Sequence, residues 1–179
     1  MNKILKEKLR LFYYECKSQY NLIKPIKYKI KKSKKILIIA SSSPSHLISL
    51  LKLLNDLDNK LCIKIIGKFN HIEIAKKSYP DYKYIHYKYD GLFKPNIIIK
   101  YFDDFNIRNN TSIIFLSNNK NATGYKNIFE LCLMMNHNCY FFNSNFQFYY
   151  LSINQIKDRL NIISIENSIT QWYKNDYIP

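Results

Sequence analysis

Apolar residues along this chain fall into short runs separated by polar turns, and the runs follow two different periods. Five runs of four to eight residues, rich in Ile, Phe and Tyr, predict β-strands at residues 36–40, 61–66, 82–89, 111–116 and 139–142. The segments between them place apolar residues three and four positions apart, which predicts helices at residues 44–57, 72–79, 97–105 and 125–135. The stretch 146–160 also reads as a helix.

Strands that alternate with helices predict an α/β fold, because each helix carries the chain back to start the next parallel strand. We expect a single doubly wound, Rossmann-like domain over residues 35–160, with a mostly parallel five-stranded sheet in the order 3-2-1-4-5. In that order the chain reverses direction between the first and fourth strands. A crevice for a ligand is then expected at the carboxyl ends of these strands.

Two segments lie outside this domain. Residues 1–34 predict a basic amphipathic helical extension, since its apolar residues recur at helical spacing until Pro25. That apolar stripe consists of Leu5, Leu9, Phe12, Cys16, Tyr20 and Ile23. Residues 161–179 form a C-terminal tail, with a helical pattern around residues 168–173.

Positive charge is concentrated in the extension. The chain has a net charge of +15, and residues 1–35 hold twelve Lys and Arg side chains against two glutamates. Three interpretations stay open: the helix packs on the domain, residues 3–35 lie on an anionic membrane surface, or they dock nucleic acid. The domain itself shows no DNA- or RNA-binding motif, so nucleic acid is the least favoured.

The sequence contains no run of 18 apolar residues and no apolar core of a signal peptide, so we expect a cytoplasmic location, with the basic helix allowing peripheral attachment to the inner face of the membrane. Cys16, Cys62, Cys132 and Cys139 lack CxxC spacing. We expect them to be small buried hydrophobic residues rather than metal ligands or disulfides.

The turn after the first predicted strand carries the clearest chemical signal. It reads SSSPSH, and it contains Ser41, Ser42, Ser43, Ser45 and His46. Ser43 is a plausible N-cap and Pro44 a first helical residue, and the hydroxyl and N–H groups there suit an anion or a sugar hydroxyl. The turn lacks glycine, which disfavours binding of a dinucleotide or a nucleoside triphosphate.

Two further strand exits are polar. The exit after residue 116 offers Asn118, Asn119, Gly124, Tyr125 and Asn127, whose amides suit sugar hydroxyls but also favour turns. The exit after residue 142 holds Asn143 and Asn145 next to aromatic residues, which suit carbohydrate stacking, although most of these aromatics are expected in the core.

Two residues are candidates for a catalytic role. His46 and Asp90 are the candidate bases, since no GxSxG motif supports a serine triad. No spacing of His or carboxylate residues indicates a metal site, and we expect neither a metal nor a cofactor.

Three segments together resemble the amino-terminal, Rossmann-like half of GT-B glycosyltransferases, and in particular the family 9, heptosyltransferase-like proteins. They are KKILIIASSSPSHLISLLKLL, TSIIFLSNNKNATGYKNIFELCLMMN and NCYFFNSNFQFYYLS. In this family the amino-terminal half faces the acceptor and the other half binds the nucleotide-sugar. The turn at Ser41–Ser45 differs from the Gly-Asp of typical heptosyltransferases, which removes the carboxylate that would serve as base.

The resemblance implies a glycosyltransferase-like half-domain that binds a sugar-bearing or phosphorylated glycan acceptor in cell-envelope polysaccharide synthesis. A partner chain would then supply the donor site. The alternative from a different class is a non-catalytic Rossmann-like scaffold that assembles with other proteins.

Overall fold

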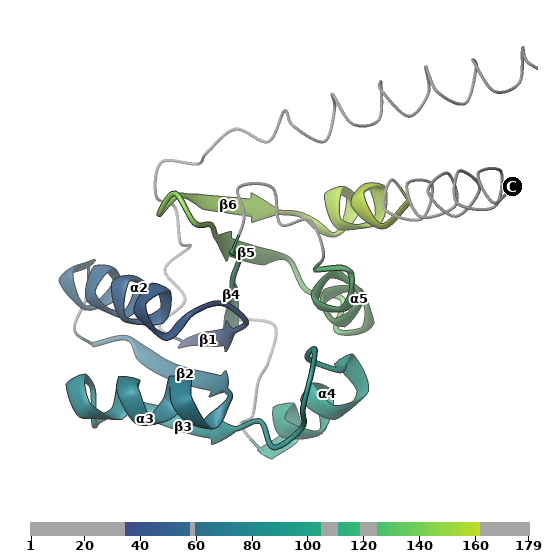
Figure 1. Cartoon of the computed structure of the whole chain (residues 1–179). Coiled ribbons are helices and arrows are strands. Elements are labelled where there is room, and N and C mark those ends of the chain that lie inside the picture. The colour runs from purple at the N-terminus through teal and green to yellow at the C-terminus, as the bar shows by residue number, and fades with distance from the viewer. Residues whose placement is uncertain (1–34, 58–59, 105–110, 119–124, 162–179) are drawn as a thin grey trace, which may run out of the picture.

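The computed structural model describes residues 35–57, 60–104, 111–118 and 125–161, which form a six-stranded sheet with helices on both faces (Figure 1). The strands are β1 (Lys35–Ala40), β2 (Cys62–Gly67), β3 (Lys83–His86), β4 (Thr111–Leu116), β5 (Cys139–Phe142) and β6 (Phe148–Leu151). The helices are α2 (Pro44–Leu57), α3 (Phe69–Ser78), α4 (Pro95–Asp104) and α5 (Lys126–Met134), and residues 153–161 are also helical.

The order of strands in the sheet is β3-β2-β1-β4-β5-β6. The first five are parallel, and β6 pairs with β5 in the antiparallel direction. This confirms the α/β class and the predicted order of the five parallel strands. β1 lies in the middle, with Ile38 opposite Ile65 of β2 and Ile114 of β4.

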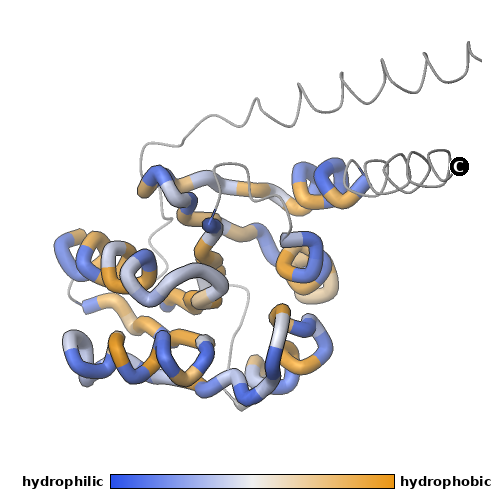
Figure 2. Tube along the Cα trace, viewed as in Figure 1, coloured by the Kyte–Doolittle hydropathy of each residue, from blue (hydrophilic) through white to orange (hydrophobic). Residues whose placement is uncertain are grey.

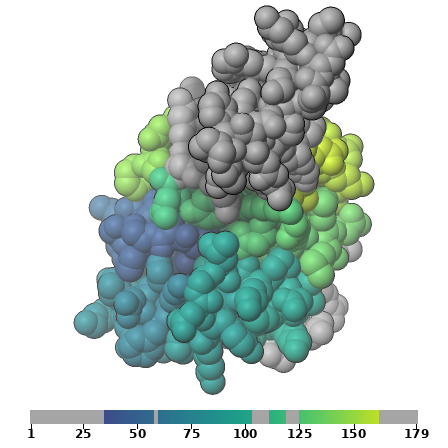
Figure 3. Space-filling view, turned by 45° about the vertical axis from the view of Figure 1, so that its right-hand side comes forward, coloured from purple at the N-terminus to yellow at the C-terminus, as the bar shows by residue number. Residues whose placement is uncertain are grey.

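Both faces of the sheet are covered, which explains why apolar residues follow one another without alternation in the central strands, as in Ile36–Ala40 and Ile113–Leu116. Ile36 and Ile38 of β1 face α2 and α3, where they pack with Leu50 and other leucines. Leu37 and Ile39 face the opposite side, where α4, α5 and residues 153–161 lie. Figure 2 shows the apolar colouring along the sheet and on the inner sides of these helices. α4 and α5 lie side by side on their face, as the ribbon and space-filling views both show (Figures 1 and 3).

The prediction of one helix over 146–160 was wrong. Residues 148–151 form β6, and the helix begins only at residue 153. The aromatic residues that were spaced like a helix face instead pair across two strands. Phe141 of β5 stacks on Tyr149 of β6, with ring centroids 4.7 Å apart. A single-sequence pattern does not report this pairing, because the partner strand decides it.

The prediction for the cysteines holds in part. Cys132 and Cys139 are buried, as expected, whereas Cys62 is exposed, which corrects the expectation of burial. Cys62 is the first residue of β2 and lies where the strand emerges at the edge of the core. Cys16, the predicted basic helix and the tail from residue 162 lie outside the described residues.

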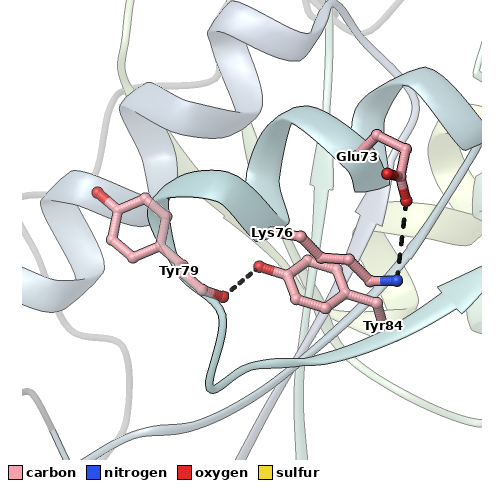
Figure 4. A network of polar contacts seen from close by, with 4 residues as sticks. All are labelled: Glu73, Lys76, Tyr79 and Tyr84. Atoms are coloured by element: carbon pink, nitrogen blue, oxygen red, sulfur yellow. Dashed lines mark hydrogen bonds and ion pairs between the residues drawn. The ribbon is translucent and has the colours of Figure 1, made fainter.

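A tyrosine of β3 forms a hydrogen bond with the C-terminal end of α3 (Figure 4). The Tyr84 hydroxyl donates to the carbonyl of Tyr79, 2.7 Å away, at the residue that ends α3. Lys76 lies 3.8 Å from the Glu73 carboxylate and 5.9 Å from the centre of the Tyr84 ring. Burial, assisted by the neighbouring Tyr82 and Tyr79, raises the pKa of Tyr84 to about 12, so its hydroxyl remains a donor.

None of the helices within the described residues has the length and apolar composition needed to cross a bilayer.

Candidate functional site

The turn between β1 and α2 is folded as the sequence predicts. Pro44 is the first residue of α2, and the His46 N–H donates to the Ser43 hydroxyl at 3.3 Å, which makes Ser43 the N-cap. The Ser45 hydroxyl lies 3.1 Å from that of Ser43, and both residues are exposed. These two serines therefore shape the start of the helix.

The exits of β1 and β4 are joined by hydrogen bonds. The Ser41 hydroxyl donates to the Leu116 carbonyl at 2.6 Å. Next to it, Ser42 Oγ contacts the side-chain amide of Asn118, and the Asn118 N–H donates to the Tyr125 hydroxyl at 2.8 Å. Residues far apart in the sequence thus meet at the carboxyl edge of the sheet, as expected for neighbouring parallel strands.

A cavity of about 410 Å³ lies at this point. This volume falls within the range of small-molecule sites. The cavity is lined from four directions, by the exits of β1, β2 and β4 and by the segment between β3 and α4. Its lining residues are Ala40, Ser41, Ser42, Lys68, His71, Gly91, Leu92, Phe93, Asn118, Tyr125, Asn127 and Ile128.

Five of the residues predicted as ligand-binding meet in this cavity. They are Ser41, Ser42, Asn118, Tyr125 and Asn127. Four other predicted ligand-binding residues, Ser43, Ser45, Asn143 and Asn145, do not line it, and neither do the candidate bases His46 and Asp90. Asp90 is exposed beside Gly91. Asn119 and Gly124 lie outside the described residues.

The third polar exit forms a turn between β5 and β6. The buried Asn143 accepts the N–H groups of Asn145 and Gln147 on its side-chain oxygen, both at 3.0 Å. Its own N–H donates to the Gln147 carbonyl at 3.1 Å. These bonds hold the hairpin in place, and Asn145 is exposed at its tip.

His46 lies behind Ser42 rather than in the cavity wall. Its Nδ1 is 2.8 Å from Ser42 Oγ, and its Nε2 is 2.9 Å from the Asn143 carbonyl oxygen. The ring packs against Phe142 and Phe146, with centroids 4.9 and 5.7 Å away. Burial lowers the pKa of His46, and the hydrogen bond to the Asn143 carbonyl opposes this in part.

Sequence reasoning missed the wall contributed by β2. Lys68 and His71 follow β2 and line the cavity, and His71 Nε2 donates to the Ser42 carbonyl. His71 Nδ1 is buried and has no hydrogen-bond partner in the described part of the chain. The available signal was Gly67 at the end of the strand next to β1. It permits close approach, because an added Cβ would lie 3.2 Å from that of Ala40 and 3.3 Å from that of His71.

The electrostatics of the cavity favour an anion. Lys68 contributes an ammonium group, and none of the lining residues carries a carboxylate. α2, α3 and α5 begin beside the cavity, and none of the three has an acidic residue in its first turn. The positive ends of their dipoles are therefore not neutralised locally. Within the described ranges, no group of three His, Cys, Asp or Glu residues could hold a metal ion.

Fold and site together define an α/β protein with a cavity at the point where the strand order reverses, lined by apolar residues, by polar residues and by one lysine. Comparisons with family models, curated proteins and solved structures found no match for this chain.

Proposed function

We propose that this chain is a glycosyltransferase-like half-domain whose cavity binds a sugar-bearing or phosphorylated acceptor in cell-envelope polysaccharide synthesis. A partner chain would supply the site for the sugar donor. The observation that carries the proposal is the composition of the cavity wall, which includes hydroxyl and amide side chains and a lysine but no carboxylate.

The two ends of such a ligand match different parts of the wall. Asn118 and Asn127 offer side-chain amides that both donate and accept, as hydroxyls on a sugar ring require. Lys68, at the start of α3, offers a positive charge for a phosphate. One ligand that carries both groups would use both parts.

The turn after β1 argues that the donor binds elsewhere. A nucleotide-sugar carries a pyrophosphate, which usually approaches the backbone closely at a glycine. Here the corresponding residues are Ser41, Ser42 and Ser43, and none of them is a glycine. The cavity therefore suits an acceptor better than a donor.

A thermal-shift screen with glycan phosphates, the same glycans without phosphate, and nucleotide-sugars tests the proposal on the full chain. A glycan phosphate at 100 times its Kd should stabilise the fold by about 2.7 kcal/mol. Lys68→Met should weaken binding of the phosphorylated glycan but not of its unphosphorylated form. Asn118→Ala should weaken both.

Lys77→Met is the matched control, because Lys77 is an exposed lysine in the last turn of the same helix and does not line the cavity. The affinity of Lys77→Met for the phosphorylated glycan should equal that of the wild type. Absence of any shift with the glycans, or equal shifts for wild type, Lys68→Met and Asn118→Ala, would overturn the assignment.

A further inference from the structure

Ser42 and His46 form a pair that the acceptor binding proposed above does not use. Ser42 Oγ and His46 Nδ1 are 2.8 Å apart, within the reach needed for proton transfer between a nucleophile and its base. Ser42 lies two residues before α2 begins, and His46 lies in the first turn of that helix. Ser42 lines the cavity, and the buried His46 lies directly behind it with Nδ1 facing Ser42 Oγ.

The hydrogen bonds of His46 determine which nitrogen carries a proton. The Asn143 carbonyl oxygen can only accept, so Nε2 carries hydrogen and donates to it. Burial lowers the pKa of His46 and so favours the neutral ring, in which Nδ1 carries a lone pair. Nδ1 therefore accepts the hydroxyl hydrogen of Ser42.

This assignment also fixes the orientation of Asn118. The structure turns Asn118 Oδ1 towards Ser42 Oγ, as an acceptor of the Ser42 hydroxyl hydrogen. With that hydrogen directed to His46 instead, Ser42 Oγ has only lone pairs for the contact with the Asn118 side chain. The amide NH₂ of Asn118 must then face Ser42, since amide orientation follows from the hydrogen-bond network. Ser42 Oγ thus receives a hydrogen bond on the cavity side and gives one on the buried side.

The Asn143 carbonyl takes the place that a carboxylate holds in a serine triad. It fixes the tautomer of His46 and the plane of its ring. The carbonyl is itself held rigidly, because the Asn143 side chain and N–H are bonded within the β5–β6 turn. The pair is therefore oriented by a third group, the arrangement that marks an activated nucleophile.

Donors for a developing negative charge lie next to Ser42. Within the described residues, the backbone N–H groups of Ser42 and Ser43 have no hydrogen-bond acceptor. They precede α2, a helix of 14 residues without an acidic side chain in its first turn. Such N–H groups can stabilise the oxyanion of a tetrahedral intermediate.

We infer that Ser42 is a nucleophile and His46 its general base, and that the cavity hydrolyses a carboxylic ester. This activity lies beyond the proposed acceptor binding and does not depend on it.

The reaction balances with water as the second substrate. Ser42 Oγ bonds to the ester carbonyl carbon while its proton moves to His46 Nδ1. The ester C–O bond then breaks, and the leaving alcohol takes the proton from Nδ1. Water, deprotonated by His46, attacks the acyl-serine, which releases the carboxylic acid and restores Ser42.

A fluorophosphonate probe tests the inference on the full-length protein without any sugar ligand. Mass spectrometry of the labelled wild type should locate the adduct on Ser42, and this result requires no variant to fold. Hydrolysis of p-nitrophenyl acetate should be lost when Ser42 is labelled or replaced in Ser42→Ala.

The general base is tested by His46→Gln, which keeps an N–H donor for the Asn143 carbonyl but removes the proton acceptor. The rate of labelling at Ser42 should fall by a factor of about 100 or more. Ser49→Ala is the matched control, because Ser49 is on the same helix and its hydroxyl donates to the Ser45 carbonyl, away from the pair. It should label at the wild-type rate.

Three results would overturn the inference. They are a folded wild type that is not labelled, an adduct on Ser43 or Ser45 instead of Ser42, and a labelling rate at Ser42 that His46→Gln leaves unchanged. Glycan binding that depends on Lys68 is measured separately, so failure of this inference and failure of the acceptor proposal give different results.

Discussion

His46 makes the stability of this protein depend on pH, because its folded environment disfavours the imidazolium form. Burial is the main cause of its lowered pKa, and the unfolded chain has the ordinary value of 6.5. Below pH 6.5 the unfolded state therefore binds a proton more readily than the folded state. The free energy of unfolding must then fall as the pH falls from 6.5 towards the folded pKa, and it gains nothing from His46 above pH 6.5.

Urea unfolding between pH 7.5 and 5 measures this effect. The wild type should lose stability over that interval, and His46→Gln should lose less, since it has no group to protonate at this position. The difference between the two curves gives the contribution of His46 to the pH dependence of stability, separate from that of the other histidines. Parallel curves for the two proteins would show that protonation of His46 is not linked to folding.

A second residue-scale feature is the lysine in the cavity wall. Lys68 ends no apolar run and belongs to no motif, so its position in the sequence carried no chemical signal. Its role follows only from the pairing of β1 with β2, which brings the exit of β2 beside Ser41 and Ser42. Candidate residues from the exits of β1 and β4 were predictable, because the expected strand order already made those exits neighbours.

At the scale of elements, the junction of β2 and α3 sets the width of the cavity. Gly67 is the last residue of β2, and an added Cβ would lie 3.2 Å from Ala40 Cβ and 3.3 Å from His71 Cβ. Neither neighbour has a flexible end that can move away. Gly67→Ala should therefore push α3 from β1 and destabilise the fold by about 1–3 kcal/mol.

Chemical denaturation of Gly67→Ala measures that loss, and glycan binding should weaken with it because His71 and Lys68 are carried on the displaced segment. Gly91→Ala is a useful contrast. Gly91 has a φ of 79° and no atom within 4 Å of an added Cβ, so its cost comes from backbone strain alone. If Gly67→Ala is as stable as the wild type, the junction of β2 and α3 can accommodate the added methyl group.

The elements also show where sequence patterns are sufficient. β1, β4 and β5 are short apolar runs enclosed on both sides, so their composition alone identified them. β6 was misread because Phe148 and Tyr149 could belong to a helix face or to an edge strand. The choice was made by the turn at Asn143 and by pairing with β5, which local spacing does not encode.

At the scale of the whole molecule, one sheet separates two apolar clusters, and every central strand contributes to both. Leu50 of α2 belongs to one cluster, and Phe129 of α5 belongs to the other. Ile38 and Ile39 are neighbours on β1 and pack into opposite clusters. Loss of packing on one face must therefore loosen the strands that hold the other.

We expect a single cooperative unfolding transition that either face can destabilise. Leu50→Ala should cost about 2–5 kcal/mol and Phe129→Ala about 3–5 kcal/mol, because each side chain is fully buried. Leu57→Ala is the matched control on α2, since Leu57 is 51% exposed and its loss should stay within about 0.5 kcal/mol. Far-UV circular dichroism and tyrosine fluorescence should give the same midpoint in every variant. Two separate midpoints in Leu50→Ala or Phe129→Ala would mean that the faces unfold independently and that the sheet does not couple them.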